Sequence, residues 1–194
     1  MDAEYWSSRY QKKQTGWDLG AASKSLLKLF KKLNKEDKIL IPGCGNAYEA
    51  EYLFEAGYKN IHIMDFAPEP LSAFKERNKT FPTQQVIHDD FFSHREKYDA
   101  IIEQTFFCAI HPKLRRNYVD QSHDLLNENG ILIGVLFNRD FDGGPPFGGN
   151  SKEYLHLFGE KFETVEIQNC VDSVEPRLGT EVTIRCQKKS TKKI

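Results

Sequence analysis

The chain has 194 residues, 39% of them hydrophobic and 28% charged, which is typical of one globular domain with a substantial core. The net charge of −1 gives no electrostatic case for nucleic acid, and no run of about 18 apolar residues would span a membrane. Four cysteines without C-x-x-C or zinc-finger spacing, and an N-terminal sequence without a signal pattern, lead us to expect a cytoplasmic protein with free thiols and no metal.

The first 33 residues predict a helical cap that precedes the rest of the fold. Residues 3–13 are polar and aromatic and are expected to form a helix, which Thr15–Asp18 interrupts. Over 19–33, leucine and phenylalanine recur at spacings close to 3.6 residues. This spacing predicts an amphipathic helix.

From residue 39 onward, short apolar runs alternate with helical segments. The predicted strands are 39–42, 61–65, 85–88, 98–103 and 131–137. The predicted helices are 46–56, 68–79 and 113–126, the last of them ending near Asn129-Gly130. The alternation predicts an α/β sheet with helices on both faces. Ligands of such sheets bind beyond the carboxyl ends of the strands, so we expect the site there.

The C-terminal third departs from this alternation. The glycine- and proline-rich segment 142–149 cannot form regular structure. Ser151 is expected to cap a helix that ends near Phe158. Residues 162–169 and 180–187 predict two strands with no helix between them, and two such strands should pair antiparallel.

A sheet that ends in this way resembles the class I methyltransferase sheet. That fold is Rossmann-like and has seven mostly parallel strands, an antiparallel strand near the C-terminus and helices on both faces. We expect one such domain over 1–194, with the helical cap of 1–33 over the cofactor and a solvated, disordered basic tail over 188–194.

The turn after the first strand carries two of the three glycines of G-x-G-x-x-G. Gly43 and Gly45 allow backbone angles closed to other residues. Asp65 ends the second strand, where an ionised carboxylate would accept hydrogen bonds from ribose hydroxyls. Tyr48 stands where the third glycine would be, which favours an adenosine cofactor without phosphate, such as S-adenosylmethionine. The alternative is a purely structural turn with Asp65 as a helix cap.

Polar and aromatic side chains follow the third and fourth strands. Asp90 and Phe91 could hold adenine by a hydrogen bond and by stacking, although the sequence does not separate Asp90 from Asp89. The alternative is a solvated turn. Glu103 or Gln104 could accept a hydrogen bond from the ammonium group of the cofactor.

Apolar side chains at the same end of the sheet are candidates for an acceptor pocket. Phe106 and Phe107 either wall this pocket or belong to the core. Pro146 and Phe147 lie in the glycine-rich loop, which is either a surface linker or an apolar lid. Cys108 is expected to be an inert buried thiol rather than a nucleophile.

The aromatic residues of the cap admit two interpretations. Trp6 and Tyr10 lie four residues apart on one helix face, and Trp17 follows the helix. They either staple the cap to the core or close over a sulfonium, whose charge suits aromatic faces. Trp17 is also a candidate for the acceptor pocket.

Taken together, these segments resemble the thiopurine S-methyltransferase family, and specifically its thiol/halide methyltransferase branch. The resemblance covers about residues 4–186 and is most specific at Phe106–Ile110 and Gly143–Phe147. It implies S-adenosylmethionine as the methyl donor and S-adenosylhomocysteine as the product. It implies cofactor contacts at eight residues: Trp6, Tyr10, Trp17, Gly43, Asp65, Asp90, Phe91 and Gln104.

Three positions depart from relatives in that branch. Tyr10 stands where relatives often have tryptophan, and Gln104 where plant-type members have tyrosine. Phe147 replaces a tyrosine common after Gly-Gly-Pro-Pro. The last change removes a hydroxyl near the acceptor and places halide activity in doubt.

The resulting hypothesis is in-line methyl transfer to a small thiol, with halide or thiopurine as other acceptors. A thiol with a pKa near 8.5 is already a few per cent thiolate at neutral pH, so no dedicated base is required. Asp18, Glu103 and His111 are the weak candidates for one. The alternatives are another small acceptor, such as tellurite, selenite or a nitrogen or oxygen centre, and a non-catalytic cofactor-binding domain. We expect a monomer that acts on neither nucleic acid nor a membrane.

Overall fold

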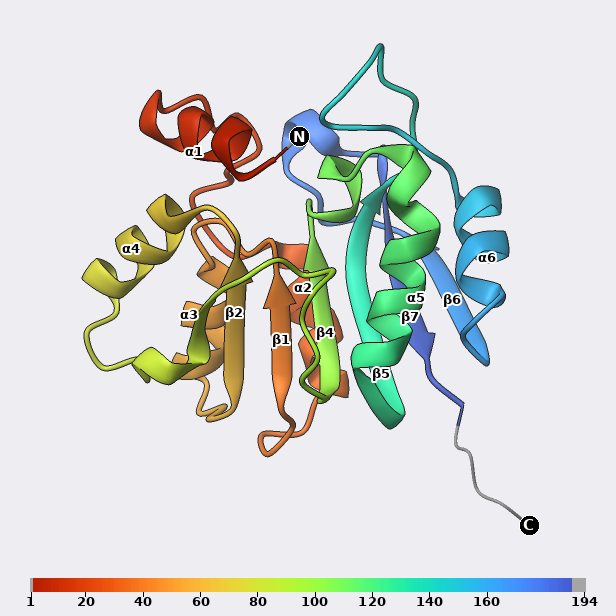
Figure 1. The fold of residues 1–194 in the computed structure, drawn as a ribbon. Helices are drawn as coiled ribbons and strands as arrows, with labels where there is room; N and C mark the ends of the chain where they lie inside the picture. Colours follow the sequence, from red (N-terminus) through yellow and green to blue (C-terminus); the bar gives the residue numbers. More distant parts are fainter. Residues whose placement is uncertain (1, 190–194) are drawn as a thin grey trace.

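The computed structural model describes residues 2–189 and contains a seven-stranded sheet with the order β3-β2-β1-β4-β5-β7-β6 (Figure 1). The strands β1 to β5 run parallel, and β7 lies between β5 and β6, antiparallel to both. Their bounds are Ile39–Pro42 (β1), Ile61–Asp65 (β2), Val86–His88 (β3), Tyr98–Gln104 (β4), Leu126–Phe137 (β5), Thr164–Asn169 (β6) and Glu181–Gln187 (β7). The class I methyltransferase sheet and its antiparallel C-terminal strand are therefore confirmed.

Helices cover both faces of the sheet, as predicted. Successive side chains of a strand point to opposite faces, so Ile39 and Ile41 pack into one core and Leu40 into the other. The first core receives α2, α3 and α4, and the second receives α5 and α6. The helix bounds are Ala3–Gln11 (α1), Lys24–Leu29 (α2), Tyr48–Glu55 (α3), Pro68–Arg77 (α4), Arg115–Leu125 (α5) and Ser151–Gly159 (α6).

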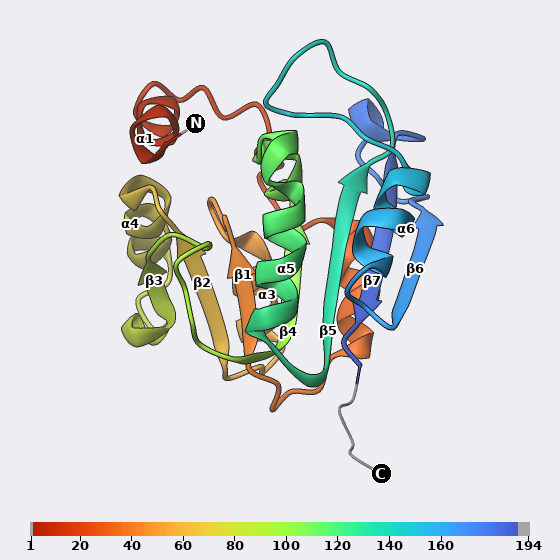
Figure 2. The same ribbon diagram turned by 45° about the vertical axis from the view of Figure 1, so that its right-hand side comes forward.

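Helix α1 does not pack on a face of the sheet. It lies beyond the carboxyl ends of the strands, and the loop between β5 and α6 rises on the same side (Figures 1 and 2). The chain from Lys12 to Ser23 connects α1 to the first helix of the sheet layer. The cap and this loop therefore lie above the edge where a ligand is expected.

The helix predicted over 19–33 is shorter than its apolar spacing indicates. Only Lys24–Leu29 is α-helical, and it continues as a single 3₁₀ turn over Phe30–Lys32. Gly20 has a φ of 70°, which a right-handed helix cannot accommodate. The prediction of a longer helix failed because the segment before Ser23 makes polar contacts with the glycine turn instead, as described below.

Two other boundaries differ from the prediction. Helix α5 ends at Leu125, and Leu126 already pairs with Tyr98 as the first residue of β5, so Asn129-Gly130 lies within a strand. Helix α6 is capped by Asn150, not Ser151. The Asn150 side chain accepts a hydrogen bond from the N–H of Glu153, which satisfies a free donor of the first turn.

Lys188, the first residue of the predicted disordered tail, makes defined contacts. The Lys188 ammonium donates to the carbonyls of His123 and Leu126 at 2.7 and 2.8 Å. These carbonyls lie at the C-terminus of α5, where a cation is favourable. Residues 190–194 of the predicted tail lie outside the described residues.

Candidate active site

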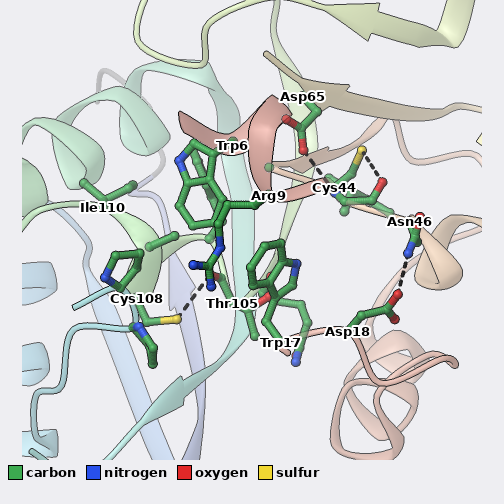
Figure 3. A pocket seen from close by; sticks show the side chains of 18 of the residues that line it. Trp6, Arg9, Trp17, Asp18, Cys44, Asn46, Asp65, Thr105, Cys108 and Ile110 are labelled. Atoms are coloured by element: carbon green, nitrogen blue, oxygen red, sulfur yellow. Dashed lines mark hydrogen bonds between the residues drawn. The ribbon is translucent and has the colours of Figure 1, made fainter. Parts of the chain in front are cut away.

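A cavity of about 790 Å³ opens at the carboxyl ends of the strands, beneath the N-terminal cap. Its walls come from α1, the glycine turn, the ends of β2 and β4, and the loop after β5. Figure 3 shows Arg9 between Trp6 and Trp17, with Cys108 on one side and Asp65 with Cys44 on the other. This position is the one that strand order alone predicts for a ligand.

The glycine turn is held against the end of β2. Gly43 and Gly45 have φ angles of 54° and 52°, a region that favours glycine. A Cβ at Gly43 would lie 2.2 Å from the ring of Phe106, so the turn also needs glycine for space. The turn therefore leaves its backbone close to the cavity.

Asp65 connects this turn to the following helix. One carboxylate oxygen accepts from the N–H of Gly45 at 3.1 Å and the other from the N–H of Ala67 at 2.9 Å. Burial raises the pKa of Asp65, and the bonds from Ala67 and Gly45 act against that rise. The N–H of Phe66 also acts on this carboxylate, and because two oxygens can together accept four hydrogen bonds, acceptor capacity remains for a ligand hydroxyl.

The two acids after β3 have different surroundings. Asp89 uses both oxygens, accepting from the N–H of Asp90 and the hydroxyl of Ser93 and contacting the His94 ring at 3.3 Å. Within the described residues, the Asp90 carboxylate accepts only from the N–H of Phe92, and the residue is exposed. Both line the cavity, and Asp90 has the free oxygen.

Phe91 lines the cavity but is mainly a core residue. Its ring is 3% exposed and stacks on Tyr118 at 5.3 Å. The predicted stacking on adenine therefore involves at most an edge of this ring.

Trp6, Tyr10 and Trp17 form one aromatic group in the cap. The rings of Trp6 and Tyr10 both meet Trp17 edge-on, at 5.2 and 5.7 Å. All three residues line the cavity. Both predicted roles are compatible with this arrangement, because the group packs internally and also presents aromatic surface to a ligand.

Polar contacts fix the cap to the sheet. The Asp18 carboxylate accepts from the side-chain amide of Asn46 and the N–H of Gly20, and the buried Glu49 accepts from the N–H of Ser23 at 2.9 Å. From the opposite wall, Arg177 donates to the carbonyl of Trp17 at 2.8 Å. These contacts hold the chain between α1 and α2 out of helical structure.

Glu103 does not reach the cavity, in contrast to the prediction. Its side chain is fully buried and its carboxylate accepts from the N–H groups of Phe106 and Phe107 at 2.9–3.1 Å. Gln104 does line the cavity, and its amide oxygen is buried without a hydrogen-bond partner. Such an orphaned acceptor is costly unless a ligand satisfies it, which fits an ammonium group.

The two phenylalanines predicted for the acceptor pocket lie in different surroundings. Phe106 lines the cavity, whereas Phe107 packs in the core against Tyr118, Tyr154 and Phe158. Between β4 and this segment, Thr105 has a φ of 60°, which is unusual for a β-branched residue.

The loop after β5 forms part of the cavity wall. Pro145 and Pro146 line the cavity, but Phe147 does not. The N–H of Phe147 donates to the carbonyl of Cys108 at 2.7 Å, and its ring packs on His111. The buried Arg115 donates to Glu153 and to the carbonyls of Phe147 and Gly148.

Each of the predicted bases already accepts hydrogen bonds within the protein. Asp18 and Glu103 are engaged as described, and the Nδ1 of His111 accepts from the N–H of Lys113. Cys108 is 7% exposed, and burial raises the pKa of its thiol well above the ordinary range. Cys108 is therefore an inert thiol at neutral pH.

Several lining residues were missed at the level of sequence. Arg9 lies three residues after Trp6, so the helix pattern that identified Trp6 and Tyr10 could have found it. Arg139 follows directly after the fifth strand, where ligands bind. Arg177 comes from the β6–β7 connection, and no local pattern marks it.

Among residues 2–189, no group of three or more His, Cys, Asp or Glu side chains is arranged to hold a metal ion. No helix within the same residues is long and apolar enough to cross a membrane.

Comparison with known proteins identifies the family to which the chain is similar over its whole length. The model of the family "Thiopurine S-methyltransferase (TPMT)" matches residues 1–194. A "Probable thiol methyltransferase 2" of Arabidopsis thaliana is 29% identical, over 96% of this chain and 85% of its own length. A thiopurine S-methyltransferase of Vibrio vulnificus is 25% identical, over 93% of this chain and 92% of its own.

The fold also has solved relatives. A Burkholderia thailandensis 1,6-didemethyltoxoflavin-N1-methyltransferase, crystallised with S-adenosylhomocysteine, has a TM-score of 0.75. Its identity is 17%, over 97% of this chain and 87% of that chain, a likeness of fold alone.

Proposed function

Because the chain belongs to the thiopurine S-methyltransferase family, we propose that it transfers the methyl group of S-adenosylmethionine to a small thiol. Use of this methyl donor follows from family membership, and the thiol is supported by relatives named for thiol and thiopurine methylation. When bound, the donor supplies an electrophilic methyl group on a sulfonium sulfur. The observation that carries the proposal is a cavity with polar acceptors at one side and the apolar side chains of Phe106, Pro145 and Pro146 at the other.

The residues at the β1–β2 side fit the donor. The free lone pairs of Asp65 would accept from the ribose hydroxyls, and the free oxygen of Asp90 from the adenine amino group. The orphaned amide oxygen of Gln104 would accept from the ammonium group. The backbone of Gly43 and Gly45 leaves room for the donor, and the faces of Trp6, Tyr10 and Trp17 suit its positive charge.

The opposite wall suits a soft nucleophile. Phe106, Pro145 and Pro146 present apolar surface there. A thiolate and a sulfonium lose their opposite charges as the methyl moves, so an apolar wall favours the transition state over the separated ions. The three predicted bases already accept hydrogen bonds within the protein, so we expect the acceptor to ionise by itself, as a thiol can.

A panel of acceptors tests this proposal. Transfer of labelled methyl from S-adenosylmethionine is measured with thiols, thiopurines, halides, tellurite, selenite and small amines. We expect turnover to be highest with thiols and low with halides, because Phe147 offers no hydroxyl and does not line the cavity. Higher turnover with a nitrogen, oxygen or tellurium acceptor than with thiols would contradict the proposal that the acceptor is a thiol. Binding of S-adenosylhomocysteine without turnover of any acceptor would instead support a non-catalytic domain.

Replacing Asp65 tests the donor site separately. Asp65→Ala should raise the Kd for S-adenosylhomocysteine about 100-fold or more, because two charge-assisted hydrogen bonds are lost. The variant Asp37→Ala, which removes a surface carboxylate away from the cavity, is the control. Calorimetric titration gives the Kd, and thermal unfolding confirms that both variants fold. An unchanged Kd for Asp65→Ala would refute the ribose role.

We further propose that residues 1–194 act as one domain and as a cytoplasmic monomer on a small-molecule acceptor. The single continuous sheet and the continuous cavity support this organisation. Sedimentation equilibrium should give a mass near 22.4 kDa. A dimer at micromolar concentration would contradict the proposal.

A further inference from the structure

Three arginines stand beside six acidic residues in the wall of a cavity that is expected to receive a sulfonium. Arg9, Arg139 and Arg177 all line it. Arg177 is engaged, because it donates to the carbonyl of Trp17 and pairs with Glu181. Arg9 and Arg139 have no acidic partner among residues 2–189. Unpaired guanidinium groups in a sheltered cavity would repel a sulfonium and attract an anion.

Arg139 lies in the segment that forms the acceptor wall. Its backbone is fixed by a bridge to Gly149, whose N–H donates to the Arg139 carbonyl at 3.0 Å. The guanidinium lies over the Phe141 ring at 4.7 Å, and its Nε donates to the Asp140 carbonyl at 3.4 Å. Within the described chain, neither terminal nitrogen makes a hydrogen bond. The edge that would bind an oxyanion is therefore free.

Arg9 carries the second free cation. It extends from α1 into the cavity and lies over the Trp17 ring at 5.7 Å (Figure 3). Its Nε is buried without a hydrogen-bond partner. The methyl donor has a single carboxylate, so it can neutralise only one of the two guanidinium groups. At least one remains for the acceptor.

We propose that the acceptor is a thiol that also carries a carboxylate, and that Arg139 binds this carboxylate. The inference rests on the proposed thiol methylation and specifies its substrate class. A guanidinium presents two parallel N–H groups that match a carboxylate, and the Phe141 ring behind it limits competing water. Arg139 holds the acceptor carboxylate at the cavity wall, and the sulfur end of the acceptor then extends into the cavity.

Matched acid and amide acceptors test this inference. The pairs are 3-mercaptopropionate with 3-mercaptopropionamide and 4-mercaptobenzoate with 4-mercaptobenzamide, which differ only in charge. In at least one pair, kcat/KM for the acid should exceed that for the amide about tenfold or more. Arg139→Gln should bring this ratio towards one by raising KM for the acid, and Arg139→Lys should restore part of it. Arg116→Gln, which removes an exposed arginine paired with Glu160, should keep the wild-type ratio.

A binding measurement separates this inference from the proposed function. The S-methylated acid and amide of each pair are titrated into protein saturated with S-adenosylhomocysteine. Tighter binding of an acid, lost in Arg139→Gln while the Kd for S-adenosylhomocysteine stays unchanged, supports the carboxylate site even without turnover. Equal binding and turnover of acid and amide in both pairs would overturn it, as would a preference that survives in Arg139→Gln. Turnover of neutral thiols alone would refute only this inference, whereas absence of turnover would refute only the proposed enzyme activity.

Discussion

Glu103 is a buried carboxylate that accepts from the backbone N–H groups of Phe106 and Phe107 and lies beside the Tyr118 hydroxyl, and no cation among residues 2–189 pairs with it. Burial raises its pKa to about 7, and the hydrogen bonds from Phe107 and Phe106 limit the rise. Its unfolded pKa is about 4.3. The folded protein therefore keeps a proton that the unfolded chain releases between about pH 4 and 7.

This difference predicts a pH-dependent stability. As pH rises through that window, the Glu103 contribution lowers the free energy of unfolding by about 3 kcal/mol and is then constant. Glu103→Gln keeps an acceptor oxygen but has no proton to lose. Urea denaturation at pH 5, 6, 7 and 8 should show the variant gaining stability relative to wild type as pH rises. Parallel curves for the two proteins would contradict the assignment.

At the scale of elements, two neighbouring arginines on α5 offer a matched comparison. Arg115 is 4% exposed and joins α5 to α6 and to the loop that carries Pro145 and Pro146. Arg115→Met should lower the free energy of unfolding by about 2 kcal/mol, because Glu153 and the partly buried carbonyls of Phe147 and Gly148 lose their donor. Arg116→Met, which breaks an exposed pair, should cost less than about 1 kcal/mol. Urea denaturation measures the free energy of unfolding of both variants. Equal losses would show that the Arg115 contacts to α6 and the loop add no stability beyond that of an exposed pair.

Element-level patterns predicted most of the fold, and they placed the residues proposed for the donor along one cavity. Strand–helix alternation is local, and it correctly identified the glycine turn and placed Asp65 beside it. One error in the predicted site concerns two adjacent residues of the same strand. Gln104 faces the cavity while Glu103 is buried, because successive side chains of a strand point to opposite faces and the sequence does not say which. Arg177 contacts a residue 160 positions away, and no local pattern encodes such a contact.

For the whole molecule, the cavity between the cap and the sheet implies coupling between ligand and stability. A ligand that binds only the folded protein stabilises it by about 2.7 kcal/mol at 100 times its Kd. For a domain of this size, S-adenosylhomocysteine at that concentration should raise Tm by roughly 5–10 °C. Thermal unfolding monitored by fluorescence suits the two cavity tryptophans. No change in Tm, despite binding measured by calorimetry, would mean that unfolded and folded chains bind alike.

The place of β7 has a consequence for how the protein is made on the ribosome. β6 is synthesised before β7, but it has no partner in the sheet until β7 enters between it and β5. Arg177, which precedes β7, also completes the wall that holds the cap synthesised first. Most of the sheet can therefore assemble during translation, whereas the binding cavity closes only when the final described strand has emerged.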